Sequence, residues 1–419
     1  MLMIITALYS LYILTKLYIS VMQIGYINQK KREEAILMPP SEYLKAGNYA
    51  AAKETLSILT TFMEFALFIV WIGGGIAYLE RLTTGLDPVW ASVVSVNAFI
   101  LINGALALPF EYYGKFVIDE KFGFNRSSVK QFVKDTLIST ILTVVIGSFI
   151  IVGVHYFISS TELWWLWSFL FLFAVVIAAN MLFPTIRALF FDTLTPLEDE
   201  ELAEEIRRLM DATGFQSSGV FVSDASKRDA KLNAYFGGLG KTKRVVLFDT
   251  LLEKLSHKEL LAVLGHELGH FAHGDIYKNI AMVGAMLFVM FAVFGNLPES
   301  LYLEMGVSAS PAVLMMLFLL LMPLVGFIAM PIMGIVSRHN EYEADKSGAQ
   351  LGGGAEYLVA ALKKLVKENK SFPLSHPLYI FFYYTHPPVI ERFRELGVDI
   401  DTLREEEHIP DSLGGVWPT

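Results

Sequence analysis

The chain has 419 residues, of which 54% are hydrophobic and 18% are charged. Soluble proteins carry about a quarter of their residues as charged side chains, so this composition indicates a membrane protein. A net charge of −9 without a basic cluster argues against a nucleic-acid partner. The absence of cysteine excludes disulfides and thiolate metal ligands, so any metal must be held by His, Asp or Glu.

Seven stretches are long and apolar enough to cross about 30 Å of hydrocarbon. They lie near residues 2–22, 56–78, 90–110, 137–158, 163–184, 278–296 and 311–335. The first stretch lacks a basic start and a small-residue cleavage site, so it predicts a retained span rather than a signal peptide. The sequence therefore predicts a multi-pass integral membrane protein in contact with a lipid bilayer.

The loops between these stretches predict the orientation. Lysine and arginine gather in the loops 23–55 and 111–136, whereas the loops 79–89, 159–162 and 297–310 carry almost none. Positively charged loops remain on the cytoplasmic side. We therefore expect an outside N-terminus, with both large soluble segments, including the catalytic candidates, in the cytoplasm.

A small α/β segment follows the fifth predicted span. Residues 196–215 have helical periodicity with acids at their start, which suits the helix dipole. The stretches 219–224, 232–238 and 244–249 are rich in Val, Phe and Tyr and predict strands. A glycine-rich connection predicts a hairpin between the last two strands.

The motif His266-Glu-Leu-Gly-His270 places two imidazoles one helical turn apart, on a helix that begins at a capping box formed by Ser256 and Glu259. Histidines at this spacing can bind one Zn²⁺. Glu267 borders the same face and can take a proton from a water in the open coordination position. The alternative is two surface histidines that share a capped helix.

Catalytic zinc needs a third protein ligand. His273 fits the C-terminus of a helix better than a ligand position. Glu341 and Asp345, in SRHNEYEADKSG, are four residues apart and share a helix face, whereas Glu343 points away. One carboxylate of this pair can bind metal while the other hydrogen-bonds a ligand histidine. An ordinary acidic helix start, capped by Asn340, is the alternative.

The C-terminal segment predicts two more helices, at about 336–351 and 355–368, separated by three glycines. Further on, His386 is followed by two prolines in THPPVIERF. Near a membrane zinc site such a histidine could stabilise an oxyanion. Taken alone, it is typical of a turn.

We expect four parts along the chain. They are five membrane helices with cytoplasmic loops in 1–184, an α/β zinc-binding insert in 185–277, membrane helices six and seven in 278–335, and cytoplasmic helices that supply the third zinc ligand in 336–419.

Several blocks together resemble the type-1 CAAX prenyl proteases, which are integral-membrane zinc metallopeptidases of the gluzincin kind. These blocks are DEKFGFNRSS, FDTLTPLEDEEL, NAYFGGLGKTKRVVLFDTLL, LAVLGHELGHFAHGD, SRHNEYEAD and THPPVIERF. They cover most of the chain and are far more specific than the five-residue zinc motif. One departure is Glu343, which stands where family members often carry glutamine.

The resemblance implies a role for each matched residue. His266, His270 and Glu341 match the zinc ligands, and Glu267 matches the general base. Asp345 matches a carboxylate that supports a ligand. Asn233 matches a residue that holds the substrate backbone, and His386 matches a histidine that steadies the tetrahedral intermediate.

The resemblance also implies a mainly α fold. Seven membrane helices would enclose a chamber, and a small gluzincin-like α/β metalloprotease domain would lie on the cytoplasmic side. A chamber would explain polar residues within the spans, namely Glu64, Asn97, Asn103 and Asn180.

The implied function is a zinc metalloendopeptidase with one Zn²⁺ per chain, which removes the C-terminal tripeptide of prenylated proteins or cuts related peptides. Short loops and a tail without a basic retrieval signal favour a prokaryotic member in the inner membrane; a eukaryotic member would lie in the endoplasmic reticulum. Two other functions stay open: a quality-control protease acting on non-prenylated membrane proteins, and a non-catalytic membrane scaffold.

Overall fold

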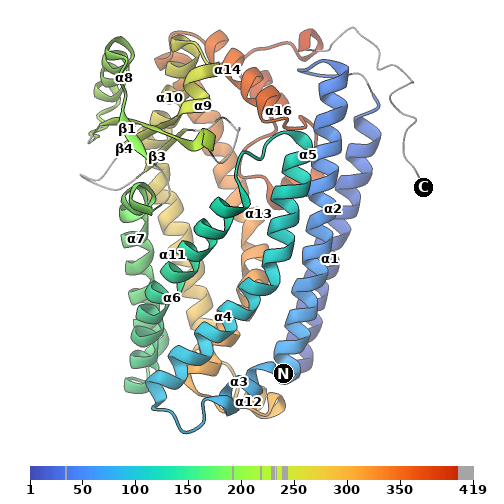
Figure 1. Ribbon diagram of the computed structural model, residues 1–419, viewed down its shortest axis with the longest axis vertical. Helices are drawn as coiled ribbons and strands as arrows, with labels where there is room; N and C mark the ends of the chain where they lie inside the picture. The colour runs from blue at the N-terminus through green and yellow to red at the C-terminus, as the bar shows by residue number, and fades with distance from the viewer. Residues whose placement is uncertain are drawn as a thin grey trace.

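The computed structural model describes residues 1–33, 35–190, 193–217, 219–227, 232, 234–237 and 244–403. Long helices run side by side along the longest axis of the molecule, and a small sheet with shorter helices covers one end (Figure 1). The N-terminus lies at the opposite end. The pair α1 and α2 forms one side of the bundle, α6, α7 and α11 form the other, and α4 and α13 lie between them.

Seven helices of the described residues are long and apolar enough to cross a membrane, which confirms the seven predicted spans. They occupy Leu2–Lys30, Pro40–Leu82, Pro88–Phe122, Val129–Ser160, Trp164–Phe183, Asp275–Phe294 and Pro311–Leu351. Two of these stretches, Pro40–Leu82 and Pro88–Phe122, each join several shorter elements. The corresponding helices are α1 (Leu2–Lys30), α2 (Pro40–Val70), α3 (Ile76–Leu82), α4 (Pro88–Tyr113), α5 (Glu120–Phe122), α6 (Val129–Ser160), α7 (Trp164–Phe190), α11 (Asp275–Phe294) and α13 (Pro311–Leu351).

Local sequence explains how these helices begin and bend. Asp87 caps α4 by accepting a hydrogen bond from the backbone of Val89, and Ser310 caps α13 in the same manner. Between α2 and α3 the chain widens into a π-helical segment, Trp71–Gly75, and Gly74 adopts φ 139°. Only glycine adopts this conformation readily, so Gly74 permits the kink.

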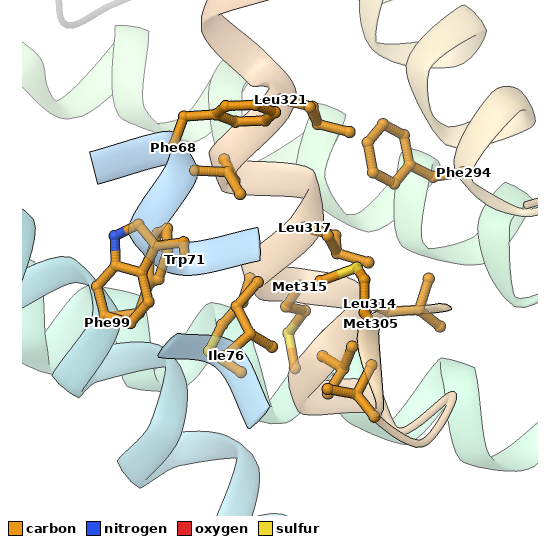
Figure 2. Close-up of a cluster of buried hydrophobic side chains, with 14 of the residues drawn as sticks. Phe68, Trp71, Ile76, Phe99, Phe294, Met305, Leu314, Met315, Leu317 and Leu321 are labelled. Carbon is orange, nitrogen blue, oxygen red and sulfur yellow. The ribbon is translucent and has the colours of Figure 1, made fainter. Parts of the chain in front are cut away.

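The main apolar core lies among the membrane helices and is centred on α13. Figure 2 shows Trp71 against Phe99, and Phe68 and Ile76 on the side of α13, which contributes Leu314, Leu317 and Leu321. A short helix, α12 (Glu299–Met305), adds Met305 to the same cluster. Packing of this kind replaces the hydrophobic effect as the source of cohesion between helices in lipid.

The four polar residues of the predicted spans have partners. Glu64 accepts hydrogen bonds from Tyr9 and Tyr12 and forms a 2.7 Å ion pair with Lys16. Asn97 donates to Ser148, Asn103 accepts from Trp71, and Asn180 donates to the backbone of Val176. Hydrogen bonds therefore offset part of the cost of these polar groups, although Asn97 Oδ1 is buried without one in the described structure and Asn180 is exposed.

The membrane-distal unit combines a four-stranded sheet with helices. The strand order is β1-β2-β4-β3; β2 and β4 are parallel, and the other two pairings are antiparallel. The elements are β1 (Leu194–Pro196), α8 (Glu200–Thr213), β2 (Val220–Ser223), β3 (Ala234–Gly237), β4 (Arg244–Phe248), α9 (Asp249–Lys254), α10 (His257–Ala272), α14 (Ala355–Glu368), α15 (Pro377–Tyr383) and α16 (Val389–Glu395). The three predicted strands are present, and β1 is a strand that the sequence analysis missed.

The prediction of two separate helices around residue 335 is wrong. A single helix, α13, continues from the apolar span through to Leu351 (Figure 1). The sequence changes there from apolar to charged, which suggested a boundary, but neither proline nor glycine stops the backbone after Pro331. Glu341 and Asp345 therefore stand on a rigid extension of a membrane helix.

Candidate metal centre

The HExxH residues lie on α10, and the helix begins as the sequence predicts. Ser256 accepts from the backbone of Glu259, whose carboxylate accepts in return from the Ser256 backbone, so the capping box is formed. His266 is buried, and the His266 and His270 rings are 4.8 Å apart between centroids. His273 is exposed and caps the C-terminus of α10, as expected.

Glycines permit α10 and α13 to pack closely enough for their side chains to meet. A Cβ atom on Gly269 would lie 2.7 Å from the Cβ of Ser347, and one on Gly348 would lie 2.9 Å from the carbonyl oxygen of Ala262. Any larger residue would force the helices apart. Gly269, the fourth residue of the motif, thus has a packing role that its spacing alone does not reveal.

Two imidazoles and one carboxylate converge between these helices. His266 Nε2 lies 3.5 Å from Glu341 Oε2, and His270 Nε2 lies 3.3 Å from Glu341 Oε1. One ligand atom from each residue lies within 4.8 Å of the others. Ligands bonded at 2.0–2.1 Å in a tetrahedron are about 3.4 Å apart, so the group fits a small divalent cation.

A further observation tests that fit. Glu341 is only 3% exposed, and its Oε2 atom has no hydrogen-bond partner in the described structure. A buried carboxylate oxygen without a partner is costly. A cation between the three residues would satisfy it, so the donor set and the burial both suit a metal ion.

Carboxylates behind the histidines fix the direction of both rings. His266 Nδ1 lies 2.9 Å from Asp345, and His270 Nδ1 lies 2.9 Å from Asp275. Each Nδ1 bond leaves Nε2 facing Glu341, as in metal sites whose ligand histidines donate to a carboxylate. Residue spacing predicted the pairing of Glu341 with Asp345. It did not predict a role for Asp275, although this residue directly follows Gly274 in the quoted block.

Hydrogen bonding controls protonation of His270 in the metal-free site. Burial lowers the pKa of His270, but hydrogen bonds to Glu341 and Asp275 outweigh it and raise the pKa to about 9. A proton therefore balances Glu341 when no cation is present. Metal binding must displace that proton, which couples metal affinity to pH.

The segment from α15 to α16 joins this centre through three contacts along one face of α13. Arg338 donates to the carbonyl oxygens of Ile380 and Tyr384, at 3.3 and 2.6 Å. One turn further along α13, Glu341 Oε1 lies 2.7 Å from Nδ1 of His386. A second turn further along, Asp345 accepts two hydrogen bonds from a nearly buried arginine, Arg392 on α16.

Sequence reasoning missed Arg338 and Arg392, although both stand in the quoted blocks. Glu343 pairs with Lys346 away from the centre, as expected. His386 is 67% exposed and therefore faces open space while it holds Glu341. Asn233 lies outside the described residues.

A seven-span helical protein with a largely buried His-His-Glu group, a glutamate within the HExxH helix and, among the described strands, β3 at the edge of the sheet has the architecture of an integral-membrane metallopeptidase. Two family models agree with this class. Peptidase family M48 matches residues 196–398, and CAAX prenyl protease N-terminal, five membrane helices, matches residues 23–193.

Relatives cover nearly the whole chain. It is 33% identical to the CAAX prenyl protease 1 homolog of Dictyostelium discoideum over 364 residues, which are 84% of each protein. It is 32% identical to CAAX prenyl protease 1 of Saccharomyces cerevisiae, covering 88% of this chain and 90% of the relative. The human homolog is 30% identical, with 86% and 87% covered. The chain belongs to the CAAX prenyl protease 1 family.

A solved structure supports the fold. The crystal structure of S. mikatae Ste24p superposes with a TM-score of 0.87 at 29% identity, covering 94% of this chain and 99% of that one. The predicted mainly helical fold, the small sheet and the metalloprotease class are therefore confirmed.

Proposed function

We propose that His266, His270 and Glu341 hold one Zn²⁺ per chain and that the protein is an endopeptidase acting on prenylated peptides near their C-terminus. The observation that carries this proposal is the buried Oε2 of Glu341, which accepts no hydrogen bond from the described residues and lies near two oriented imidazoles. The activity in the names of the fungal, amoebal and human relatives supports the substrate class.

A bound zinc ion would supply Lewis-acid polarisation of the scissile carbonyl and lower the pKa of a water molecule. Glu267 takes the proton of that water as general base and returns it to the leaving amine. His386, next to Glu341, donates a hydrogen bond to the developing oxyanion. Asp345 and Asp275 keep the two histidines oriented.

The substrate backbone pairs with the open edge of β3, where strand addition supplies main-chain hydrogen bonds. We assign Asn233, which directly precedes β3, to this contact. We also propose that the α/β unit and the C-terminus face the cytoplasm, following the lysine and arginine bias of the loops. The four-part division of the chain and a chamber between the spans belong to the same proposal.

The test uses purified protein, a farnesylated peptide with three residues after its modified cysteine, and an unprenylated twin. Zinc content is measured alongside product masses. Glu267→Gln should keep zinc and lose about 100- to 10,000-fold in cleavage, the usual contribution of a general base. Loss of zinc in that variant, or cleavage that resists metal chelation, would contradict the assignment.

The family relationship favours CAAX-type cleavage over general quality-control proteolysis and over a scaffold role. Equal cleavage of the prenylated peptide and its twin would instead support quality-control proteolysis.

A further inference from the structure

A cavity of about 450 Å³ lies between α1, α2, α15 and the loop that follows α14. Its volume falls in the range of ligand sites. Its polar lining includes Gln23, Glu54, Asn369, Lys370, Tyr379 and Tyr384. None of these residues has a role in the chemistry described above.

Hydrogen bonds and chain connectivity place this cavity between the start of β3 and the segment that carries His386. The Asn369 side chain accepts from the backbone N–H of Leu232 at 2.8 Å and donates to its carbonyl oxygen at 3.3 Å. Leu232 stands two residues before β3 begins. On the other wall, Tyr384 stands two residues before His386, so their Cα atoms are at most about 7 Å apart.

Strand direction decides which end of the substrate reaches the cavity. β3 is an edge strand and is antiparallel to its only sheet neighbour in the described structure, β4. Antiparallel pairing is the commoner mode. An added antiparallel strand runs from Gly237 toward Ala234, so its C-terminal end points toward Leu232 and the cavity.

The cavity also offers an unmatched positive charge. Lys370 Nζ donates to the carbonyl oxygen of Phe122 and lies 4.4 Å from the centre of the Phe124 ring. Within the described part of the chain, no carboxylate lies within 4.0 Å of that nitrogen, and burial lowers the pKa of Lys370. The backbone of Lys370 is strained, with φ 45°.

The other charged groups of the lining already make hydrogen bonds or ion pairs with side chains. Lys53 pairs with Asp119 at 3.2 Å. Both oxygens of Glu54 accept hydroxyl hydrogen bonds, from Ser20 and Tyr379. Lys370 is therefore the group in this cavity that an incoming anion would stabilise.

We propose that this cavity receives the C-terminal end of the substrate and that Lys370 binds its free α-carboxylate. The proposal rests on the proposed function and refines it: the enzyme selects a chain end, not merely a peptide bond. Three extended residues span about 10 Å, so a C-terminal tripeptide extends well beyond the scissile bond along β3 toward Leu232. A carboxamide end would leave the Lys370 charge unmatched.

The experiment compares two prenylated peptides that differ only in a C-terminal carboxylate or carboxamide. A charged hydrogen bond contributes about 1.5–3 kcal/mol, so the native protein should favour the acid by about 10- to 100-fold in kcat/KM. Lys370→Gln should reduce cleavage of the acid to the rate of the amide and leave the amide rate unchanged. Lys370→Arg should keep most of the preference for the acid.

Lys367→Gln is the matched control, because Lys367 pairs with Glu42 and does not line the cavity; its acid-to-amide ratio should equal that of the native protein. Equal cleavage of the two peptides by the native protein would overturn the carboxylate site and leave the proposed function intact. An equal fall for both peptides in Lys370→Gln, with Lys370→Arg insensitive to the end group, would assign Lys370 a structural role. Failure of the native protein to cut either peptide would instead refute the proposed function.

Discussion

Two carboxylates that lie between helices of this protein make opposite use of their charge. Glu64, between α1 and α2, is surrounded by Lys16 and two tyrosine hydroxyls. Glu341, between α10 and α13, has histidines close by and one oxygen without a hydrogen bond. A carboxylate whose oxygens both accept hydrogen bonds stabilises the contact between two helices. A carboxylate with one oxygen that accepts none can bind a cation.

Replacing each glutamate by glutamine tests most directly whether Glu341 binds metal and Glu64 stabilises the fold. Glu341→Gln should lose zinc and cleavage to background, because the third ligand loses its charge. Glu64→Gln should keep both but lower stability by about 2 kcal/mol, because the half-buried Lys16 loses its charged partner. Metal analysis, cleavage rates and thermal unfolding separate the two outcomes. Zinc retained by Glu341→Gln would show that the ion is held elsewhere.

Asp275→Asn tests whether a carboxylate orients His270 within the metal centre. The amide can no longer orient His270 as a charged acceptor, so zinc affinity should fall by about 10- to 100-fold. Competition with a graded series of chelators measures this change. Asp135→Asn, on the distant helix α6, serves as a control that should bind zinc like the native protein. Unchanged affinity in Asp275→Asn would exclude the orienting role.

A substitution of Arg338 tests whether α13 positions His386 through the carbonyl groups at the end of α15. Arg338→Gln should lower kcat by about tenfold without loss of zinc, because a small displacement at an active site is costly. In a double-mutant cycle with His386→Ala, the second substitution should add little if Arg338 acts through His386. Fully additive losses would indicate two independent roles.

The smallest expected effect concerns the start of α10. Ser256→Ala removes the cap and should cost about 1 kcal/mol, seen as a lower unfolding temperature with normal zinc binding. An unchanged unfolding temperature would show that the cap contributes nothing.

The same capping box predicts a pH dependence. Burial raises the pKa of Glu259, but hydrogen bonds from Lys364 and Ser256 outweigh it and lower the pKa below its usual range. The ionised carboxylate therefore stabilises the fold above about pH 4.3, the pKa of an unfolded glutamate, and this contribution is lost as pH falls through the lower folded value. The stability difference between the native protein and Glu259→Gln should shrink in acid. A difference that is constant with pH would contradict this account.

Periodic and local features of this protein could be predicted from its sequence. Apolar length identified all seven spans, because hydrocarbon thickness sets the length of a spanning helix. Spacing of four residues placed His266 with His270, and Glu341 with Asp345, because such residues share a helix face. The capping box at Ser256 was equally local, since it involves one helical turn.

Contacts between groups far apart in the sequence became known only from the tertiary structure. It brought Asp275 and Arg392 behind the ligand histidines and the Asp345 carboxylate, joined the predicted helix at 336–351 to the seventh span, and set Asn369 beside Leu232, two residues before β3. Such contacts depend on how closely α10 and α13 approach, which glycines at 269 and 348 permit. Periodicity carries no information about that distance, because it describes one element at a time.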